Sequence, residues 1–197
     1  MNALNEFEQI VDKIYGFYLD STSGFGELKM KIGKAQTESL HLFQKSHPEL
    51  ANIEYLDGAA MIYGEGEPGT PEAVELHRCN QKQYKERNSE KGDNFKLAGN
   101  LCLVSLYQYW EDHYRSKIAA LIGTEKNTLN IDIMGDLRLL RNSIIHHAGI
   151  ALKDVEQCKL LKWFKEGEEI FIDKEKFKKI IFLLKHLIKK IKAAIRS

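Results

Sequence analysis

The placement of proline is the feature that most limits what this chain can fold into. The 197 residues include only three prolines, Pro48, Pro68 and Pro71, and all of them lie between residues 46 and 94, where glycines are also frequent. Proline disrupts helix interiors and glycine favours turns. Residues 46–94 are therefore predicted to form an excursion of loops around one short helix, while the proline-free stretches on both sides can form long helices.

Apolar residues in the proline-free stretches recur every three or four positions, which places them on one face of a helix. The predicted helices cover about 4–18, 27–45, 95–122, 132–148, 153–165 and 177–195. Pro71 suits a first helical position and predicts a further helix to about Asn88. Residues 170–172, which are apolar between charges, predict one short extended segment. We therefore expect an all-α fold, an antiparallel helical bundle in one domain over residues 1–197, with residues 46–94 inserted.

Composition and hydropathy indicate a soluble globular protein without a membrane segment. Hydrophobic residues make up 43% of the chain and charged residues 29%, a balance typical of folded soluble domains. The first residues include acidic side chains where a secretory signal has a basic start, and the longest apolar run, residues 180–188, is too short to span a bilayer. We therefore expect a cytoplasmic protein.

The three cysteines, Cys79, Cys102 and Cys158, lie far apart in the sequence and form no CxxC pair. An odd number at this spacing indicates neither a disulfide framework nor a cysteine-rich zinc site. We expect buried or incidental thiols, and we expect the chain to use no metal and no cofactor.

Positive charge gathers at the end of the chain. The formal net charge is only +1, which neither favours nor excludes nucleic acid as a partner. The last helical stretch nevertheless contains Lys174, Lys176, Lys178, Lys179, Lys185, Lys189, Lys190, Lys192 and Arg196. These residues are either the solvated outer face of an amphipathic helix or a surface that attracts phosphate.

The segment MGDLRLLRNSIIHHAG, residues 134–149, carries more polar chemistry than a core helix needs. Asp132 is predicted to cap this helix and Gly149 to end it. On an ideal helix, Arg141 and His146 lie about 140° apart. We therefore expect them to serve one site only through the reach of arginine, through a distortion of the helix, or through a partner surface that brings two copies together.

The run from Arg141 to His146, RNSIIH, resembles the R-x4-6-H signature of the HEPN superfamily, in which a polar residue commonly follows the arginine. The order of elements from Phe95 to Ala151, a long aromatic and acidic helix followed by the motif helix, is also similar to that of HEPN bundles. The resemblance implies a metal-independent endoribonuclease, often a toxin or a phage-defence effector. It also implies a homodimer with a composite site and, in a toxin pair, a nucleotidyltransferase-like antitoxin.

The residue types suit cleavage of RNA by its own 2′-hydroxyl, which needs a base, an acid and positive charge at the phosphate. His146 is the candidate acid or base, Arg141 the candidate for holding the phosphorane, and Asn142 a candidate for orienting either. Supporting roles are predicted for Glu111 and Asp136, which could orient Arg141 or His146 and could equally be surface partners of other arginines. His147 is a less certain second histidine.

Other functions remain open at this point. A metal site formed by His113, His146 and His147 is disfavoured, because adjacent histidines on a helix point about 100° apart and no H-E-x-x-H pattern occurs. The sequence contains no GxSxG nucleophile elbow, so it gives no support for a serine hydrolase. A noncatalytic HEPN-like module that binds a nucleotide or a protein is the main alternative, followed by an interaction-only bundle without a ligand.

Overall fold

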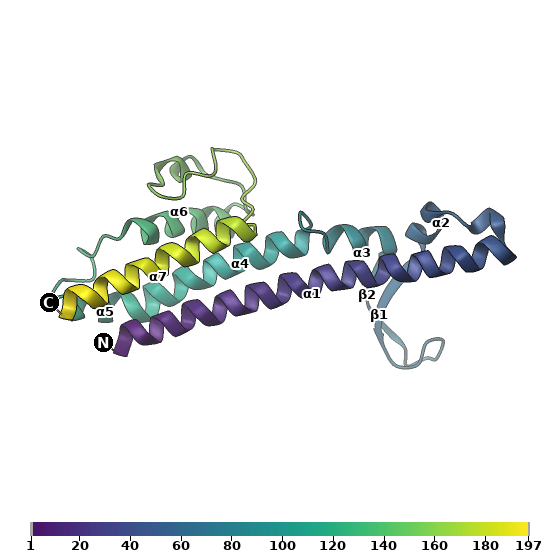
Figure 1. The fold of residues 1–197 in the computed structure, drawn as a ribbon, viewed down its shortest axis with the longest axis horizontal. Coiled ribbons are helices and arrows are strands. Elements are labelled where there is room, and N and C mark those ends of the chain that lie inside the picture. The colour runs from purple at the N-terminus through teal and green to yellow at the C-terminus, as the bar shows by residue number, and fades with distance from the viewer. Residues whose placement is uncertain (1, 197) are drawn as a thin grey trace. The chain divides into compact units, whose positions relative to one another are not determined.

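The computed structural model describes residues 2–196, and the fold is mainly α-helical, as predicted (Figure 1). The chain divides into two compact units, Met1–Ser21 with Lys96–Ser197, and Thr22–Phe95. The segment 46–94 that the sequence sets apart lies within the second unit. No helix among residues 2–196 is both long enough and apolar enough to cross a membrane.

Helix α1 (Asn2–Ser46) is continuous over 45 residues, and the two helices predicted for this stretch are one. The prediction treated Ser21–Gly24 as a break. Serine and glycine lower helix propensity by only about 1 kcal/mol or less each, whereas proline, which is absent from α1, costs about 3 kcal/mol. Leu4, Phe7 and Val11 are fully buried, so the first part of α1 contributes to the core of the first unit.

The first unit consists of the start of α1, a long interrupted helix and two further helices. Its elements are α4 (Asp93–Tyr109), the π-helical turn η2 (Trp110–Tyr114), α5 (Arg115–Leu121), α6 (Asp132–His146), the 3-10 turn η3 (Lys153–Gln157) and α7 (Lys174–Arg196). The predicted helix over 95–122 is thus present, although five residues widen into a π-helix. Phe7 lies 5.5 Å from Trp110 between ring centroids, which ties α1 to this turn.

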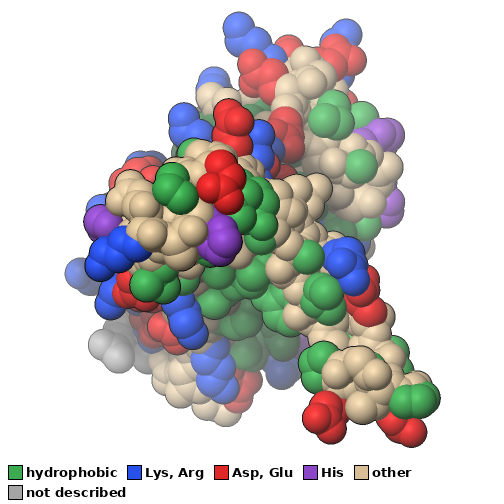
Figure 2. All heavy atoms as spheres, turned by 90° about the vertical axis from the view of Figure 1, so that its right-hand side faces the viewer, with side chains coloured by type: hydrophobic (Ala, Val, Ile, Leu, Met, Phe, Trp, Pro, Cys, Tyr) green, Lys and Arg blue, Asp and Glu red, His purple; other side chains and the backbone are tan. Residues whose placement is uncertain are grey.

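The second unit contains the two strands, which the sequence analysis did not predict. Besides the rest of α1, its elements are η1 (Pro48–Leu50), α2 (Ile53–Gly58), β1 (Ala60–Glu65), β2 (Val74–Asn80) and α3 (Gln81–Arg87). Strands β1 and β2 pair antiparallel with an irregularity at Tyr63/Gly64. Exposed Glu65, Glu67 and Glu72 make the hairpin tip acidic (Figure 2).

The helix predicted from Pro71 to Asn88 was wrong in its first half. The residues VELH, 74–77, alternate between apolar and polar, a period that favours a strand. The helix begins only after Asn80, whose side chain accepts from the N–H of Gln83 while the Gln83 side chain accepts from the N–H of Asn80. This capping box sets the start of α3.

The helix predicted over 153–165 was also wrong, because only η3 is helical there. The expected extended segment at 170–172 is not a strand; nearby, Ile150 and Glu169 form one isolated antiparallel bridge. Asn100 replaces strand pairing: its Nδ2 donates to the carbonyl of Ile170 at 2.8 Å. Gly99 permits this approach, since a Cβ at residue 99 would lie 2.0 Å from the Ile172 carbonyl oxygen.

Candidate functional site

Helix α6 presents its polar residues outward because its apolar residues fill the core. Met134, Leu137 and Leu140 are at most 4% exposed. The helix begins with Asp132 as its first residue and not as its cap; the Asp132 carboxylate instead accepts from Lys159 at 2.6 Å. The helix ends at His146, two residues before the predicted end: the backbone is left-handed at Ala148 (φ 50°) and at Gly149 (φ 81°), and Gly149 donates its N–H to the Ser143 carbonyl.

The structure brings Arg141, Asn142 and His146 of one chain together. Arg141 Nη1 lies 3.2 Å from His146 Nε2 and donates to Asn142 Oδ1 at 3.3 Å. The length of the arginine side chain therefore spans the angle between the two positions on the helix. Because arginine only donates hydrogen bonds, this contact requires His146 Nε2 to be an acceptor, with its proton on Nδ1.

The guanidinium of Arg141 is incompletely satisfied. Its Nε is buried and has no hydrogen-bond partner among the residues that the structure describes. Leaving a buried donor unpaired costs about 1–3 kcal/mol, and such groups in native proteins call for an explanation. A guanidinium binds phosphate well, and that of Arg141 is half-buried beside the exposed His146.

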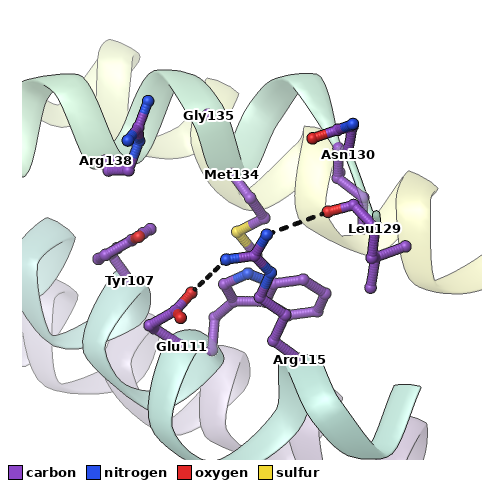
Figure 3. Close-up of a pocket in the computed structure, with 10 residues that line it drawn as sticks. Tyr107, Glu111, Arg115, Leu129, Asn130, Met134, Gly135 and Arg138 are labelled. Carbon is purple, nitrogen blue, oxygen red and sulfur yellow. Dashed lines mark hydrogen bonds and ion pairs between the residues drawn. The ribbon is translucent and has the colours of Figure 1, made fainter. Parts of the chain in front are cut away.

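A pocket of about 230 Å³ lies in the first unit, between α6 and the interrupted helix (Figure 3). It is lined by Tyr107, Trp110, Glu111, Arg115, Leu129, Asn130, Ile131, Met134, Gly135 and Arg138. Arg115 donates to the Glu111 carboxylate at 2.9 Å and to the Leu129 carbonyl at 3.4 Å. Arg138 is exposed and comes from α6, one turn before Arg141 and Asn142. The pocket is therefore polar and bordered by two arginines.

Electrostatic interactions connect the pocket to the motif. Burial raises the pKa of Tyr107, and the Glu111 carboxylate acts in the same direction, whereas Arg138, Arg115 and Arg141 oppose the rise. Arg141 thus lies close enough to influence a pocket residue. Three arginines and one glutamate therefore act on the same tyrosine, and one of these arginines, Arg115, is paired with that glutamate.

Glu111, predicted as a supporting residue, lies in this pocket and is fully engaged. Burial alone would raise its pKa, but hydrogen bonds from Lys126 and Arg115 hold the pKa below its ordinary value. Lys126 lies 2.9 Å from the carboxylate. Glu111 is thus the partner of Arg115, one of the two roles left open by the sequence, and it contacts neither Arg141 nor His146 through any hydrogen bond or ion pair in the described residues.

Asp136 does not face the motif. It is 2% exposed, and its carboxylate accepts three backbone N–H groups, from Lys159 (2.8 Å), Leu160 (2.7 Å) and Leu161 (2.8 Å). Both oxygens are therefore occupied in holding the loop that follows η3. Ser143 has a comparable role inside the motif, since its hydroxyl accepts from the N–H of Leu152 at 3.1 Å. His147 is exposed at the helix end.

Tyr107, Arg115 and Arg138 are site residues that the sequence analysis did not assign. Arg138 shares the outward stripe of α6 with Asn142, four residues on, which was a usable signal. Tyr107 of α4 stands four residues before Glu111 of η2, and both line the same pocket. The pocket itself depends on Leu129 and Asn130, which lie in a loop whose position no periodicity predicts.

The cysteines lie outside this site. All three are buried free thiols. Burial raises the pKa of Cys102 to about 11 and that of Cys158 to about 12, so both remain protonated thiols near neutral pH. Within residues 2–196, no group of three or more histidine, cysteine or carboxylate side chains is placed to hold a metal ion.

Comparison with protein-family models, with curated proteins and with solved structures finds no match for this chain. Function must therefore be inferred from the residues themselves, above all from the contact between Arg141 and His146 and from the arginine-lined pocket beside it.

Proposed function

We propose that this chain is a metal-independent endoribonuclease of the HEPN type, acting as a toxin or a phage-defence effector. The observation that carries the proposal is the 3.2 Å contact between Arg141 Nη1 and His146 Nε2 on an accessible helix end. A group that transfers protons and a group that binds phosphate are thereby held side by side. The RNSIIH resemblance supplies the family and the substrate class.

The proposed reaction uses both groups at one phosphate. The RNA phosphate accepts hydrogen bonds from the Arg141 guanidinium in place of His146. His146 Nε2 is then free to accept the proton of the 2′-hydroxyl. The 2′ oxygen then forms a bond to phosphorus while the bond to the 5′ oxygen breaks, and Arg141 stabilises the charge that develops. Asn142 accepts a hydrogen bond from Arg141 at 3.3 Å and thereby orients the guanidinium. The products are a 2′,3′-cyclic phosphate and a 5′-hydroxyl.

A homodimer is part of the proposal because the leaving 5′ oxygen needs a proton from a second group. His146 of the partner subunit, carrying a proton on Nε2, is the proposed donor, and this proton passes to the leaving 5′ oxygen. Exposed apolar side chains next to the motif, Ile145 (46% exposed) and Ile150 (44% exposed), favour such an interface. Light scattering at micromolar concentration should show a dimer, and Ile145→Glu with Ile150→Asp should shift it to monomer. A wild-type protein that is only monomeric contradicts the composite site.

The pocket favours a second candidate, a noncatalytic HEPN-like module that binds a nucleotide. Arg115, Arg138 and Tyr107 would provide charge for a phosphate and a ring for a base. In that case the chain would bind nucleotides, or a protein partner such as a nucleotidyltransferase-like antitoxin, without cutting RNA.

The test is cleavage by the purified protein in excess EDTA. RNA should be cut, and DNA of the same sequence should stay intact because it lacks the attacking 2′-hydroxyl. Arg141→Ala should abolish most activity, and Arg141→Lys should not restore it fully, since lysine lacks the planar fork. Cleavage that requires magnesium contradicts the proposal, and nucleotide binding without cleavage favours the second candidate.

A further inference from the structure

The outward face of α7 is a basic surface that the proposed site does not use. The inward face is fully committed to the core, with Phe177, Ile181, Leu184 and Ile188 at most 4% exposed. The exposed positions recur every three or four residues and form one stripe. This stripe consists of Lys174, Glu175, Lys178, Lys179, Phe182, Lys185, His186, Lys189, Lys190, Ala193 and Ala194.

An aromatic pair lies in the middle of the stripe. Phe182 is 62% exposed, and its ring lies nearly parallel to that of His186, with 14° between the planes and 6.4 Å between the centroids. Lys179 Nζ lies 5.6 Å from the Phe182 centroid. Flat rings held open to solvent beside cations are the side chains on which nucleic-acid bases stack.

The lysines of the stripe differ in how they are paired. Lys185 lies 2.5 Å from Asp12, and Lys178 lies 3.9 Å from Glu175. Lys179, Lys189 and Lys190 have no carboxylate partner among the residues that the structure describes. From Lys179 to Lys190 the helix rises about 16 Å, at 1.5 Å per residue. The stripe therefore offers free positive charge on both sides of the aromatic pair.

We propose that the outward face of α7 binds single-stranded RNA, with Lys179, Lys189 and Lys190 on the phosphates and with Phe182 and His186 stacking on bases. An anionic membrane would attract the same charge, but an interfacial helix inserts its apolar face, and the apolar face of α7 is already buried in the core. The inference extends the proposed ribonuclease function to how substrate is held, and it needs no cleavage.

The test measures binding of the full chain to a labelled, fully 2′-O-methylated single-stranded RNA by fluorescence anisotropy over a series of salt concentrations. This RNA has no free 2′-hydroxyl and cannot be cleaved by the proposed route. Replacing Lys179, Lys189 and Lys190 by glutamine should weaken binding about tenfold or more and lower the slope of log affinity against log salt by about 2, at about 0.7 per lost phosphate contact. Phe182→Ala should weaken binding about tenfold with the slope unchanged.

The matched control removes the same charge elsewhere. Lys29, Lys31 and Lys34 are exposed on α1, and replacing all three by glutamine should leave binding within about twofold of wild type. Equal losses in both triple variants, or no loss in the α7 variant, would overturn the inference. Sedimentation with phosphatidylserine vesicles without RNA binding would overturn it too. If the wild-type protein cleaves RNA but the α7 triple variant binds RNA as tightly as wild type, only this inference is refuted. If the α7 triple variant binds RNA more weakly but the wild-type protein cleaves no RNA, only the proposed ribonuclease function is refuted.

Discussion

Replacing His146 by alanine is expected to lower the rate of RNA cleavage by on the order of a hundredfold or more, the scale of losing a general acid or base. The imidazole Nε2 is the proposed acceptor of the 2′-hydroxyl proton, and among the residues that the structure describes it contacts Arg141 Nη1 at 3.2 Å. His146 is exposed, so its removal should not disturb the core. Single-turnover cleavage of an end-labelled RNA measures the effect.

His147→Ala is the matched control, because the neighbouring histidine is also exposed, whereas the contact with Arg141 is made by His146. It should reduce cleavage far less than His146→Ala, and both variants should melt at the wild-type temperature. Full activity in His146→Ala would remove the proposed mechanism.

The Asp136→Ala variant should be less stable than wild type by roughly 3 kcal/mol. The buried carboxylate accepts from the N–H groups of Lys159, Leu160 and Leu161, and each buried donor left unpaired costs about 1–3 kcal/mol. The loss is partial wherever water can replace the carboxylate. Urea unfolding followed by circular dichroism gives the free energy of unfolding.

Asp132→Ala provides the comparison on the same helix. Asp132 also contacts Lys159, but only through an exposed ion pair, which contributes little to stability. A wild-type free energy of unfolding in Asp136→Ala would contradict the structural role. An Asp136→Ala protein that remains stable but loses cleavage would return Asp136 to the predicted role of supporting the catalytic pair.

Helix periodicity predicted most of the helical fold but failed where tertiary contacts decide the conformation. The pattern correctly located α6 and α7. It placed a helix over 153–165. There, three successive backbone N–H groups donate to the Asp136 carboxylate and not to helix carbonyls. It also missed the hairpin, because the presence of Pro71 was given more weight than the alternation in VELH.

The candidate site could be predicted in its residues but not in its geometry. Arg141, Asn142 and His146 were visible as a motif, yet an ideal helix separates Arg141 from His146 by about 140°. The side-chain conformation of Arg141 closes that gap within one chain, so the reason first given for a dimer no longer applies. The roles of Asp136 and of the pocket depend on loops distant in sequence, which no local pattern encodes.

Mass spectrometry of the ends of the cleavage products tests the central claim most directly. A defined RNA, cut by the wild-type protein in excess EDTA, should give one fragment ending in a 2′,3′-cyclic phosphate and another starting with a 5′-hydroxyl, because the attacking oxygen belongs to the RNA. Fragments with a 5′-phosphate and a 3′-hydroxyl would show that water attacked the phosphorus, and they would contradict catalysis by Arg141 and His146 as proposed.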